Sequence, residues 1–314
     1  MATPKSSPTP DLKRAAEATE LARRVVEQGV RTLASLGGPD DQQVLAYDLA
    51  HSAAAVETAR SLTEYSSKGN TEALITCAFV ADMLQEVSAR LLGREDMWGV
   101  EKNPLADAHD FMTTFREPEF LAALAFTAGP RHLEDEFEMV QDTFRSFAAK
   151  VIAPHAEHVH RHNADVPEEI ISGLAELGAF GLSVPSEYGG FSEGGDGEYM
   201  ANCIATEELS RASLGIGGSL ITRPEILTRA LVNGGTEAQK QEWLPKLASA
   251  EVMAAVAVTE PDYGSDVANL TTMAVKGTNE EGVEGYIING VKTWCTFAAR
   301  ANVLMLLART DPDR

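Results

Sequence analysis

The sequence predicts an α+β protein in which a long helical part precedes a β part. Up to Leu247 the apolar residues recur at helical spacing, and from Val252 short apolar runs are separated by Gly and Asn turns. Because helices and strands do not alternate along the chain, we expect separate helical and β domains rather than βαβ repeats. The predicted order is an N-terminal helical bundle, a second helical domain and an antiparallel β domain.

The net charge of −21 and the apolar fraction of 44% restrict the class of protein. A chain of 314 residues is long enough for roughly two domains with ordinary cores. Its acidity argues against nucleic acid and anionic membranes as partners, because both require basic surfaces. The cysteines share no CxxC spacing, no apolar run approaches the roughly 20 residues of a membrane span, and residues 1–10 are polar. These features predict a cytoplasmic protein.

The N-terminal part of the chain predicts a small helical bundle without catalytic residues. Residues 1–10, rich in Ser, Thr and Pro, are expected to form a disordered leader. The bundle, residues 11–93, consists of three amphipathic helices that each end near a glycine, at 11–36, 41–67 and 71–92. No titratable cluster in it has catalytic spacing, so we interpret it as a packing or assembly element. Residues 94–130 predict a linker with an irregular helix that is broken around Pro118.

The second helical domain is expected at residues 131–250. Its clearest helix carries an apolar stripe from Leu133 to Val151 and is expected to end at Pro154. Further helices are predicted at 167–177, 197–212, 223–233 and 236–247. The last of these begins with a capping box formed by Thr236 and Gln239. Strands are predicted at 252–258, 270–276, 283–288, 291–296 and 303–309.

Two short runs in the β part carry the residues with the clearest chemistry. The run from Val256 to Asp266 is an apolar strand that stops at Glu-Pro and turns through Asp-Tyr-Gly. The run from Gly290 to Thr296 predicts a turn and then a strand, on which Trp294 and Thr296 share one face. Hydroxyl groups and an indole at the ends of neighbouring strands are suited to bind a flat ligand with polar edges.

In this order the two runs resemble the acyl-CoA dehydrogenase family, over residues 131–314. Glu207–Arg211 and Gly234–Pro245 are further segments that carry the resemblance. It implies an acyl-CoA dehydrogenase helical domain at 131–250 and the first part of the middle β domain at 251–314. It also implies FAD as cofactor and α,β-desaturation of an acyl-CoA, in which a carboxylate removes the α-proton and the β-hydrogen leaves as hydride to the flavin. An acyl-CoA substrate, electron-transfer flavoprotein and a homo-oligomer are the implied partners.

The resemblance also assigns roles to single residues. The strand end from Val256 to Thr259 would run beside the flavin ring, with Thr259 bonded to its pyrimidine edge. Trp294 would cover one side of the ring, and Thr296 would reach the nitrogen that receives the hydride. Ser265 would lie near the cofactor and the CoA arm. The expected cofactor-binding set is Val256, Val258, Thr259, Gly264, Ser265, Trp294, Cys295 and Thr296, and the expected substrate-binding set is Ser265 and Arg223.

The sequence departs from the family pattern in ways that affect the expected activity. Cys295 replaces an aliphatic residue, and Phe297 with Ala298 replaces small or polar ones. The family's catalytic Glu lies in a C-terminal helical domain, whereas this sequence ends at Arg314. We therefore expect an N-terminal portion of an acyl-CoA dehydrogenase that lacks the base, binds FAD weakly and is inactive by itself. Glu207 and Glu208 are expected to be solvated or capping residues.

The acyl group is expected to be short, with a branched or dicarboxylic group of the methylsuccinyl kind as one option. Within the family, the N-terminal extension and the segment Ser219–Ile226 most resemble the branch that acts on methylsuccinyl-CoA. Arg223 could pair with the distal carboxylate of such an acyl group. The alternative is a surface Arg223 that pairs with Glu225.

Other interpretations of the sequence remain open. His155, His158 and His162 have a spacing compatible with a metal site on a continued helix, but Pro154 favours a solvated loop, and we expect no metal. The same fold also supports an acyl-CoA oxidase or a flavin monooxygenase. A third class is a non-catalytic helical interaction protein.

Overall fold

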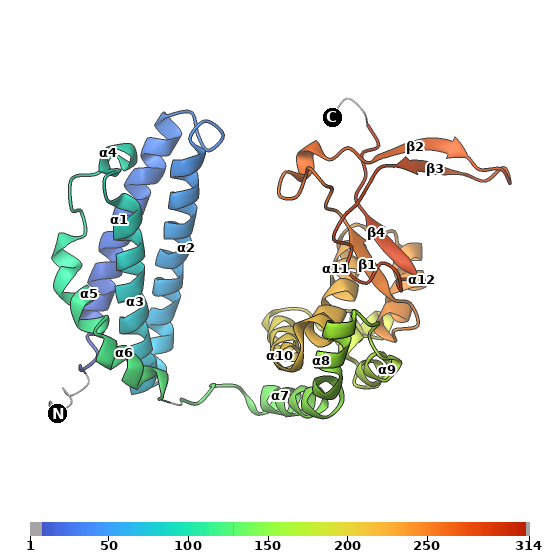
Figure 1. Cartoon of the computed structure of the whole chain (residues 1–314), viewed down its shortest axis with the longest axis horizontal. Coiled ribbons are helices and arrows are strands. Elements are labelled where there is room, and N and C mark those ends of the chain that lie inside the picture. The colour runs from blue at the N-terminus through green and yellow to red at the C-terminus, as the bar shows by residue number, and fades with distance from the viewer. Residues whose placement is uncertain (1–7, 128, 312–314) are drawn as a thin grey trace. The chain divides into compact units, whose positions relative to one another are not determined.

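The computed structural model describes residues 8–127 and 129–311. The chain forms two compact units, Met1–His132 and Leu133–Arg314 (Figure 1). The expected leader lies largely outside the described residues, and residues 8–10 have no regular secondary structure. No helix in the described part of the chain is both long enough and apolar enough to span a membrane.

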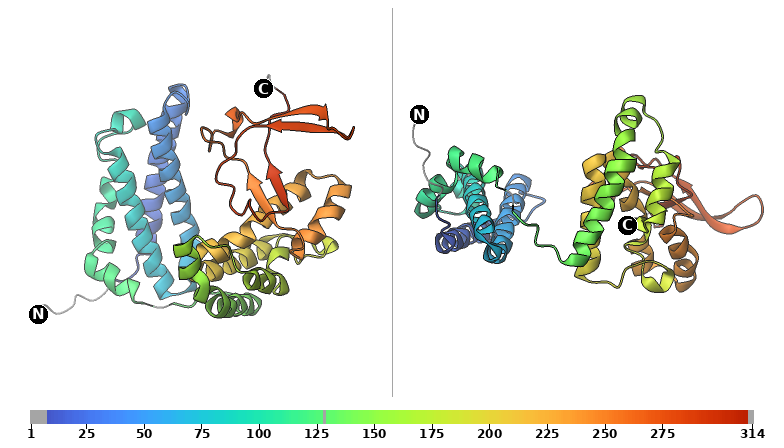
Figure 2. Two further views of the ribbon diagram at one scale, coloured as in Figure 1. Left: turned by 45° about the vertical axis from the view of Figure 1, so that its right-hand side comes forward. Right: turned by 90° about the horizontal axis from the view of Figure 1, so that it is seen from below.

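Three long helices of the first unit lie side by side, as Figures 1 and 2 show, which confirms the predicted bundle. They are α1 (Leu12–Ser35), α2 (Gln43–Tyr65) and α3 (Asn70–Leu91). Asp11 caps α1 by accepting a hydrogen bond from the Arg14 amide at 3.0 Å. Their facing stripes are largely Ala, Val and Leu, so the helices approach closely around one apolar core.

The predicted irregular helix broken around Pro118 is present, but the prediction of a linker was wrong, because the described residues from 94 to 125 pack against the bundle. They form the short helices α4 (Glu95–Trp98), α5 (His109–Phe115) and α6 (Pro118–Ala125). The Trp98 side chain is fully buried, and Phe111, Phe115 and Phe120 are also buried in the core of the bundle. Gly99 ends α4 with a left-handed backbone, and Pro118 occupies the first turn of α6. Four aromatic side chains therefore complete the core that α1, α2 and α3 begin.

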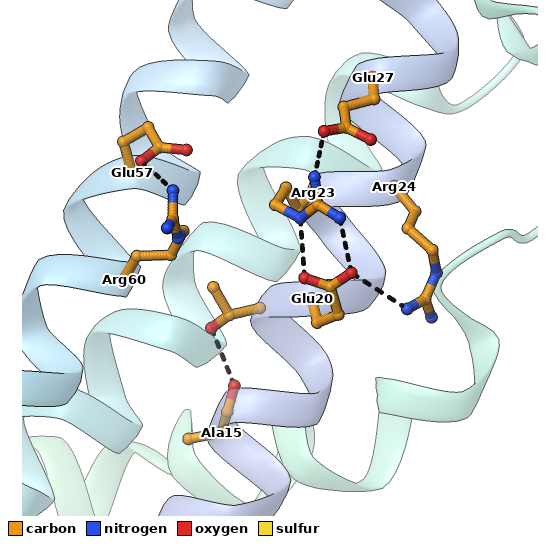
Figure 3. Close-up of polar contacts among 8 residues, drawn as sticks. Ala15, Glu20, Arg23, Arg24, Glu27, Glu57 and Arg60 are labelled. Carbon is orange, nitrogen blue, oxygen red and sulfur yellow. Dashed lines mark hydrogen bonds and ion pairs between the residues drawn. The ribbon is translucent and has the colours of Figure 1, made fainter.

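Ion pairs form between neighbouring turns on α1 and on α2 (Figure 3). On α1, Arg23 pairs with both Glu20 and Glu27, and Arg24 pairs with Glu20. On α2, Arg60 pairs with Glu57 at 2.7 Å. These are contacts between successive turns of one helix, and each such pair contributes little to stability. The apolar core is therefore the main source of the stability of this unit.

The second unit begins with α-helices; all of them except the last contribute residues to a second apolar core, and the last packs in two smaller apolar clusters. They are α7 (Asp135–Phe147), α8 (Ala153–His162), α9 (Glu168–Glu176), α10 (Asp196–Ala212), α11 (Ser219–Gly234) and α12 (Glu237–Ala248). The predicted capping box of Thr236 and Gln239 is present at the start of α12. Pro154 does not end the helix as expected. A π-helical turn, Ala148–Ile152, joins α7 to α8, and Pro154 occupies the first turn of α8, where a missing N–H is tolerated.

An ion pair between a half-exposed arginine and a buried carboxylate joins α7 to α10. Glu208 is fully buried and accepts hydrogen bonds from the Arg145 guanidinium at 2.9 and 3.2 Å. Arg211 pairs with the same carboxylate at 3.2 Å. The expectation that Glu208 is solvated was therefore wrong, because two arginines compensate for burial of the charge.

The strands form two separate pairs. β2 (Met273–Thr278) and β3 (Glu284–Asn289) form an antiparallel hairpin in which Val275 lies opposite Ile287. β1 (Ala254–Ala257) and β4 (Val303–Leu306) pair in parallel. The predicted antiparallel arrangement thus holds for the hairpin but not for β1 and β4. The intervening hairpin and loops provide the long connection that a parallel pair requires.

Candidate functional site

The two runs with the clearest chemistry lie against each other in the second unit. The Thr293 amide donates a hydrogen bond to the Thr259 carbonyl at 2.8 Å. The Lys292 ammonium donates to the Val258 carbonyl, also at 2.8 Å. The end of β1 and the loop that follows β3 are therefore joined at two consecutive residues on each side.

A buried carboxylate fixes this junction. Glu260 is 3% exposed and accepts hydrogen bonds from the Thr271 amide and hydroxyl, the Thr272 amide and the Lys292 ammonium, at 2.7 to 2.9 Å. Burial alone would raise the pKa of Glu260, but the bonds from Thr272, Thr271 and Lys292 outweigh it and hold the pKa far below its ordinary value. Glu260 is therefore ionised at neutral pH.

The sequence pattern did not reveal the pairing of Glu260 with Lys292. We interpreted Glu260 only as the point where a strand stops. The sequence did contain one indication, because Glu260 is a charged residue that directly follows an apolar strand. Such a residue needs a partner once it is buried. Its partner Lys292 is 32 positions away, and the sequence around Lys292 does not indicate that this residue pairs with Glu260.

The loop that contains Trp294 and Thr296 is not the strand that we predicted. Residues 291–295 have no regular secondary structure, and Trp294 has a left-handed backbone with φ of 58°. A left-handed residue interrupts the alternation of side chains that a strand requires. Trp294 and Thr296 therefore do not share a strand face, and the Trp294 side chain is 88% exposed.

Arg223 contacts the same loop. It lies on α11, one residue before Pro224, and its guanidinium donates a hydrogen bond to the Thr296 hydroxyl at 3.3 Å. Glu225 pairs with Arg229 at 3.0 Å. The sequence-based alternative, a pair between Arg223 and Glu225, was therefore wrong. Arg223, which we expected to bind substrate, therefore contacts Thr296, which we expected to bind the cofactor.

The remaining predicted residues lie around this junction. Val256 is on β1, opposite Met305 of β4. Gly264 and Ser265 are exposed in the turn that follows Glu260. No heavy atom lies within 4 Å of a Cβ built on Gly264. The structure therefore has room for a ligand at this turn, and the roles of Gly264 and Ser265 stay predictions.

A cavity of about 850 Å³ adjoins the loop on the side of α8. Its walls come from α8, residues 163–166, the turn from Ser213 to Ile216, and residues 295–300. Cys295 is half-buried, and its thiol lies 3.6 Å from the Thr293 carbonyl. Cys295 and Thr296 therefore link the predicted cofactor-binding loop to an open cavity.

The histidine segment is helical rather than the loop that we expected. His155 pairs with Glu169 at 2.6 Å, and the rings of His158 and His162 stack with centroids 4.4 Å apart. Within residues 8–127 and 129–311, no group of three or more His, Cys, Asp or Glu side chains is arranged to hold a metal ion.

Comparison with known families and structures identifies the second unit. Residues 134–251 match the N-terminal domain of acyl-CoA dehydrogenase, and residues 255–314 match its middle domain. The chain belongs to the acyl-CoA dehydrogenase family, as its sequence predicted. Members of this family are flavoproteins and oxidoreductases that act on CH–CH bonds. The residues brought together by Glu260 lie in the matched middle domain.

Curated relatives and solved structures agree with this family. (2S)-methylsuccinyl-CoA dehydrogenase of Cereibacter sphaeroides is 46% identical over 185 residues, which are 59% of this chain and 32% of the relative. Glutaryl-CoA dehydrogenase of Desulfococcus multivorans is 38% identical over 57% of this chain and 44% of its own length.

A solved structure of a glutaryl-CoA dehydrogenase complex with glutaryl-CoA matches with a TM-score of 0.50 and 37% identity, over 58% of this chain and 45% of that chain. Butyryl-CoA dehydrogenase from Megasphaera elsdenii also has a TM-score of 0.50, with 28% identity over 59% of this chain and 47% of its own. The chain spans less than half the length of each of these relatives.

Proposed function

We propose that this protein serves in the FAD-dependent α,β-desaturation of a short-chain acyl-CoA. The observation that carries the proposal is the junction of Thr259 with Thr293, which brings both predicted flavin-binding runs together within the matched middle domain. When bound, FAD would supply the acceptor for the hydride that leaves the β-carbon of the substrate. The base that takes the α-proton is not assigned to a residue of this chain.

The residues at the junction are chemically suited to a flavin. Trp294 presents an almost fully exposed indole, and a flat ring system stacked on it would cover apolar surface. Thr259 and Thr296 contribute hydroxyl groups that can donate to or accept from a polar ring edge. The buried Thr293 hydroxyl has no hydrogen-bond partner among the described residues, so this hydroxyl can still form a hydrogen bond at the site. Arg223 adds a positive charge next to Thr296.

Titration of the purified chain with FAD tests the cofactor. We expect the flavin fluorescence to be quenched on binding, and Thr296→Val to weaken binding and perturb the visible flavin spectrum. Thr278→Val, an exposed position at the end of β2, is the matched control and should bind like the original chain. Absence of FAD binding to the original chain, or equal effects of both variants, would contradict the proposal.

The acyl group that we propose is a short dicarboxylic one of the methylsuccinyl type. The support is Arg223, whose guanidinium donates one bond to Thr296 and has further N–H donors that can form a charge-assisted bond with a distal carboxylate. The relatives named for methylsuccinyl-CoA and glutaryl-CoA agree with a dicarboxylic acyl group. Relatives named for isovaleryl-CoA are also similar to the chain, so the identity of the acyl group depends on the test of Arg223.

We further infer electron-transfer flavoprotein as the electron acceptor, and assembly into a homo-oligomer. Both follow from membership of the family. The oxidase alternative makes the opposite prediction, namely rapid reoxidation of the reduced flavin by oxygen. Stopped-flow measurement of flavin reoxidation by electron-transfer flavoprotein and by oxygen distinguishes the dehydrogenase from the oxidase. Faster reoxidation by oxygen would favour the oxidase.

A further inference from the structure

The buried pair of Glu260 and Lys292 connects the end of β1 to the base of the β2–β3 hairpin, a hairpin with which β1 shares no strand ladder. Glu260 follows the end of β1, Thr271 and Thr272 precede β2, and Lys292 lies in the loop after β3. All three meet at one carboxylate, through the bonds from Thr271, Thr272 and Lys292. The side chains of Glu260 and Lys292 are only 2% and 8% exposed.

The geometry points to Glu260 and Lys292 as positioning residues that hold the loop of Trp294 and Thr296 against Thr259. This inference rests on the proposed flavin site and adds residues that none of the predicted roles includes. Neither residue is proposed to touch the cofactor or the substrate. They act through the backbone of the residues that are proposed to do so.

The loop needs a side-chain pair to hold it because its backbone is irregular. A strand is held in place by a row of ladder bonds, but residues 291–295 have no regular structure. Among the described residues, their backbone is linked to the end of β1 by the bond from the Thr293 amide to the Thr259 carbonyl. Lys292 precedes that bond, and its ammonium bonds both the Val258 carbonyl and Glu260. Two of its three donors are thus used to fix the loop.

A pair of apolar side chains in place of Glu260 and Lys292 could not fix the position of the loop. Apolar contacts are non-directional, whereas the Glu260 carboxylate accepts four bonds from fixed directions and thereby specifies one position for each segment. Burying two charges carries a large desolvation cost, and well-packed apolar residues are often at least as stable. The pair is therefore better explained by the position that it imposes on the loop than by added stability.

The test separates positioning from stability and from the flavin proposal. We would measure hydrogen exchange of peptides covering residues 290–297 and 273–289 without FAD, and FAD affinity by fluorescence quenching. Variants are Lys292→Met, Glu260→Gln and the double variant, which leaves no unpaired buried charge. Lys276→Met, at an exposed position on β2, is the matched control.

We expect Lys292→Met to increase exchange in 290–297 but not in the hairpin peptide, and to weaken FAD binding at least tenfold. The double variant should lose about as much affinity as either single variant, because the two residues act as one unit. Unchanged exchange in 290–297 would overturn the inference, whatever happens to FAD affinity. If the original chain binds no FAD, the proposed function fails, and the exchange of 290–297 alone decides whether the pair holds the loop.

Discussion

Arg223 and Thr296 are 73 positions apart, and yet the Arg223 guanidinium lies 3.3 Å from the Thr296 hydroxyl. The contact joins α11 of the helical domain to the loop after β3. In the proposed function, these two residues serve the acyl group and the flavin respectively. Their contact therefore places the charge that would select a dicarboxylic acyl group next to the residue expected at the reacting part of the flavin.

Arg223→Ala should weaken binding of methylsuccinyl-CoA about tenfold to a hundredfold. A hydrogen bond to a charged group contributes about 1.5–3 kcal/mol, and each 1.4 kcal/mol corresponds to about tenfold in affinity. Binding of an uncharged branched acyl-CoA of similar length should hardly change. Competition binding with both compounds measures the difference.

Arg223→Lys is the control for that prediction. It keeps the charge but loses the planar fork of the guanidinium, so an intermediate loss of methylsuccinyl-CoA affinity is expected. If Arg223→Ala weakens both acyl-CoA compounds equally, Arg223 has a structural role, and the dicarboxylic proposal fails.

Trp98→Ala should destabilise the first unit by about 3–5 kcal/mol, because it removes a large, fully buried side chain and leaves a cavity. Urea unfolding followed by circular dichroism measures the change. Leu92→Ala provides a control from the same part of the chain, since Leu92 is 77% exposed and its truncation should cost less than about 0.5 kcal/mol. Similar losses in both variants would mean that Trp98 does not belong to the core.

Thr236→Ala should destabilise the second unit by about 1 kcal/mol, through the start of α12. The Thr236 hydroxyl accepts a bond from the Gln239 amide at 3.3 Å, and the Gln239 side chain accepts one from the Thr236 amide at 2.9 Å. Alanine removes the first of these bonds. Thr236→Ser should retain most of the stability in thermal unfolding, and an equal loss in both variants would contradict a capping role.

Acid should destabilise the first unit through Glu72. Its carboxylate lies 2.7 Å from the His132 ring nitrogen, and this hydrogen bond holds the pKa of Glu72 below its ordinary value. A lowered pKa in the folded state means that the unfolded state binds the proton first as the pH falls. The associated stability is therefore present at neutral pH and is lost below about pH 4.

Urea unfolding at about pH 6 and pH 3 measures this dependence. The original chain should lose more stability between the two pH values than Glu72→Gln does. Glu64→Gln, at an exposed position on α2, should behave like the original chain. Equal losses in the original chain and in Glu72→Gln would show that the pair with His132 does not govern the acid response.

Local patterns allowed most helices to be predicted. The apolar stripes of α1, α2 and α3, the capping box of Thr236 and the hairpin of β2 with β3 all depend on residues close together in the sequence. The ordered runs around Thr259 and Trp294 were also sufficient to identify the family. In each case neighbouring side chains carry the information, so periodicity and turn residues reveal it without a structure.

Tertiary structure alone decided the features that depend on distant partners. Burial of Trp98 needs the stripes of three other helices, and burial of Glu208 needs Arg145, 63 positions away. The parallel pairing of β1 with β4 and the left-handed backbone at Trp294 override the local preference for alternating strands. The bond from Lys292 to Glu260 likewise has no local signature, because a buried charge is tolerated only where the fold supplies its partner. The sequence by itself thus determined the helices and the family, whereas the packing of distant segments decided which side chains meet at the site.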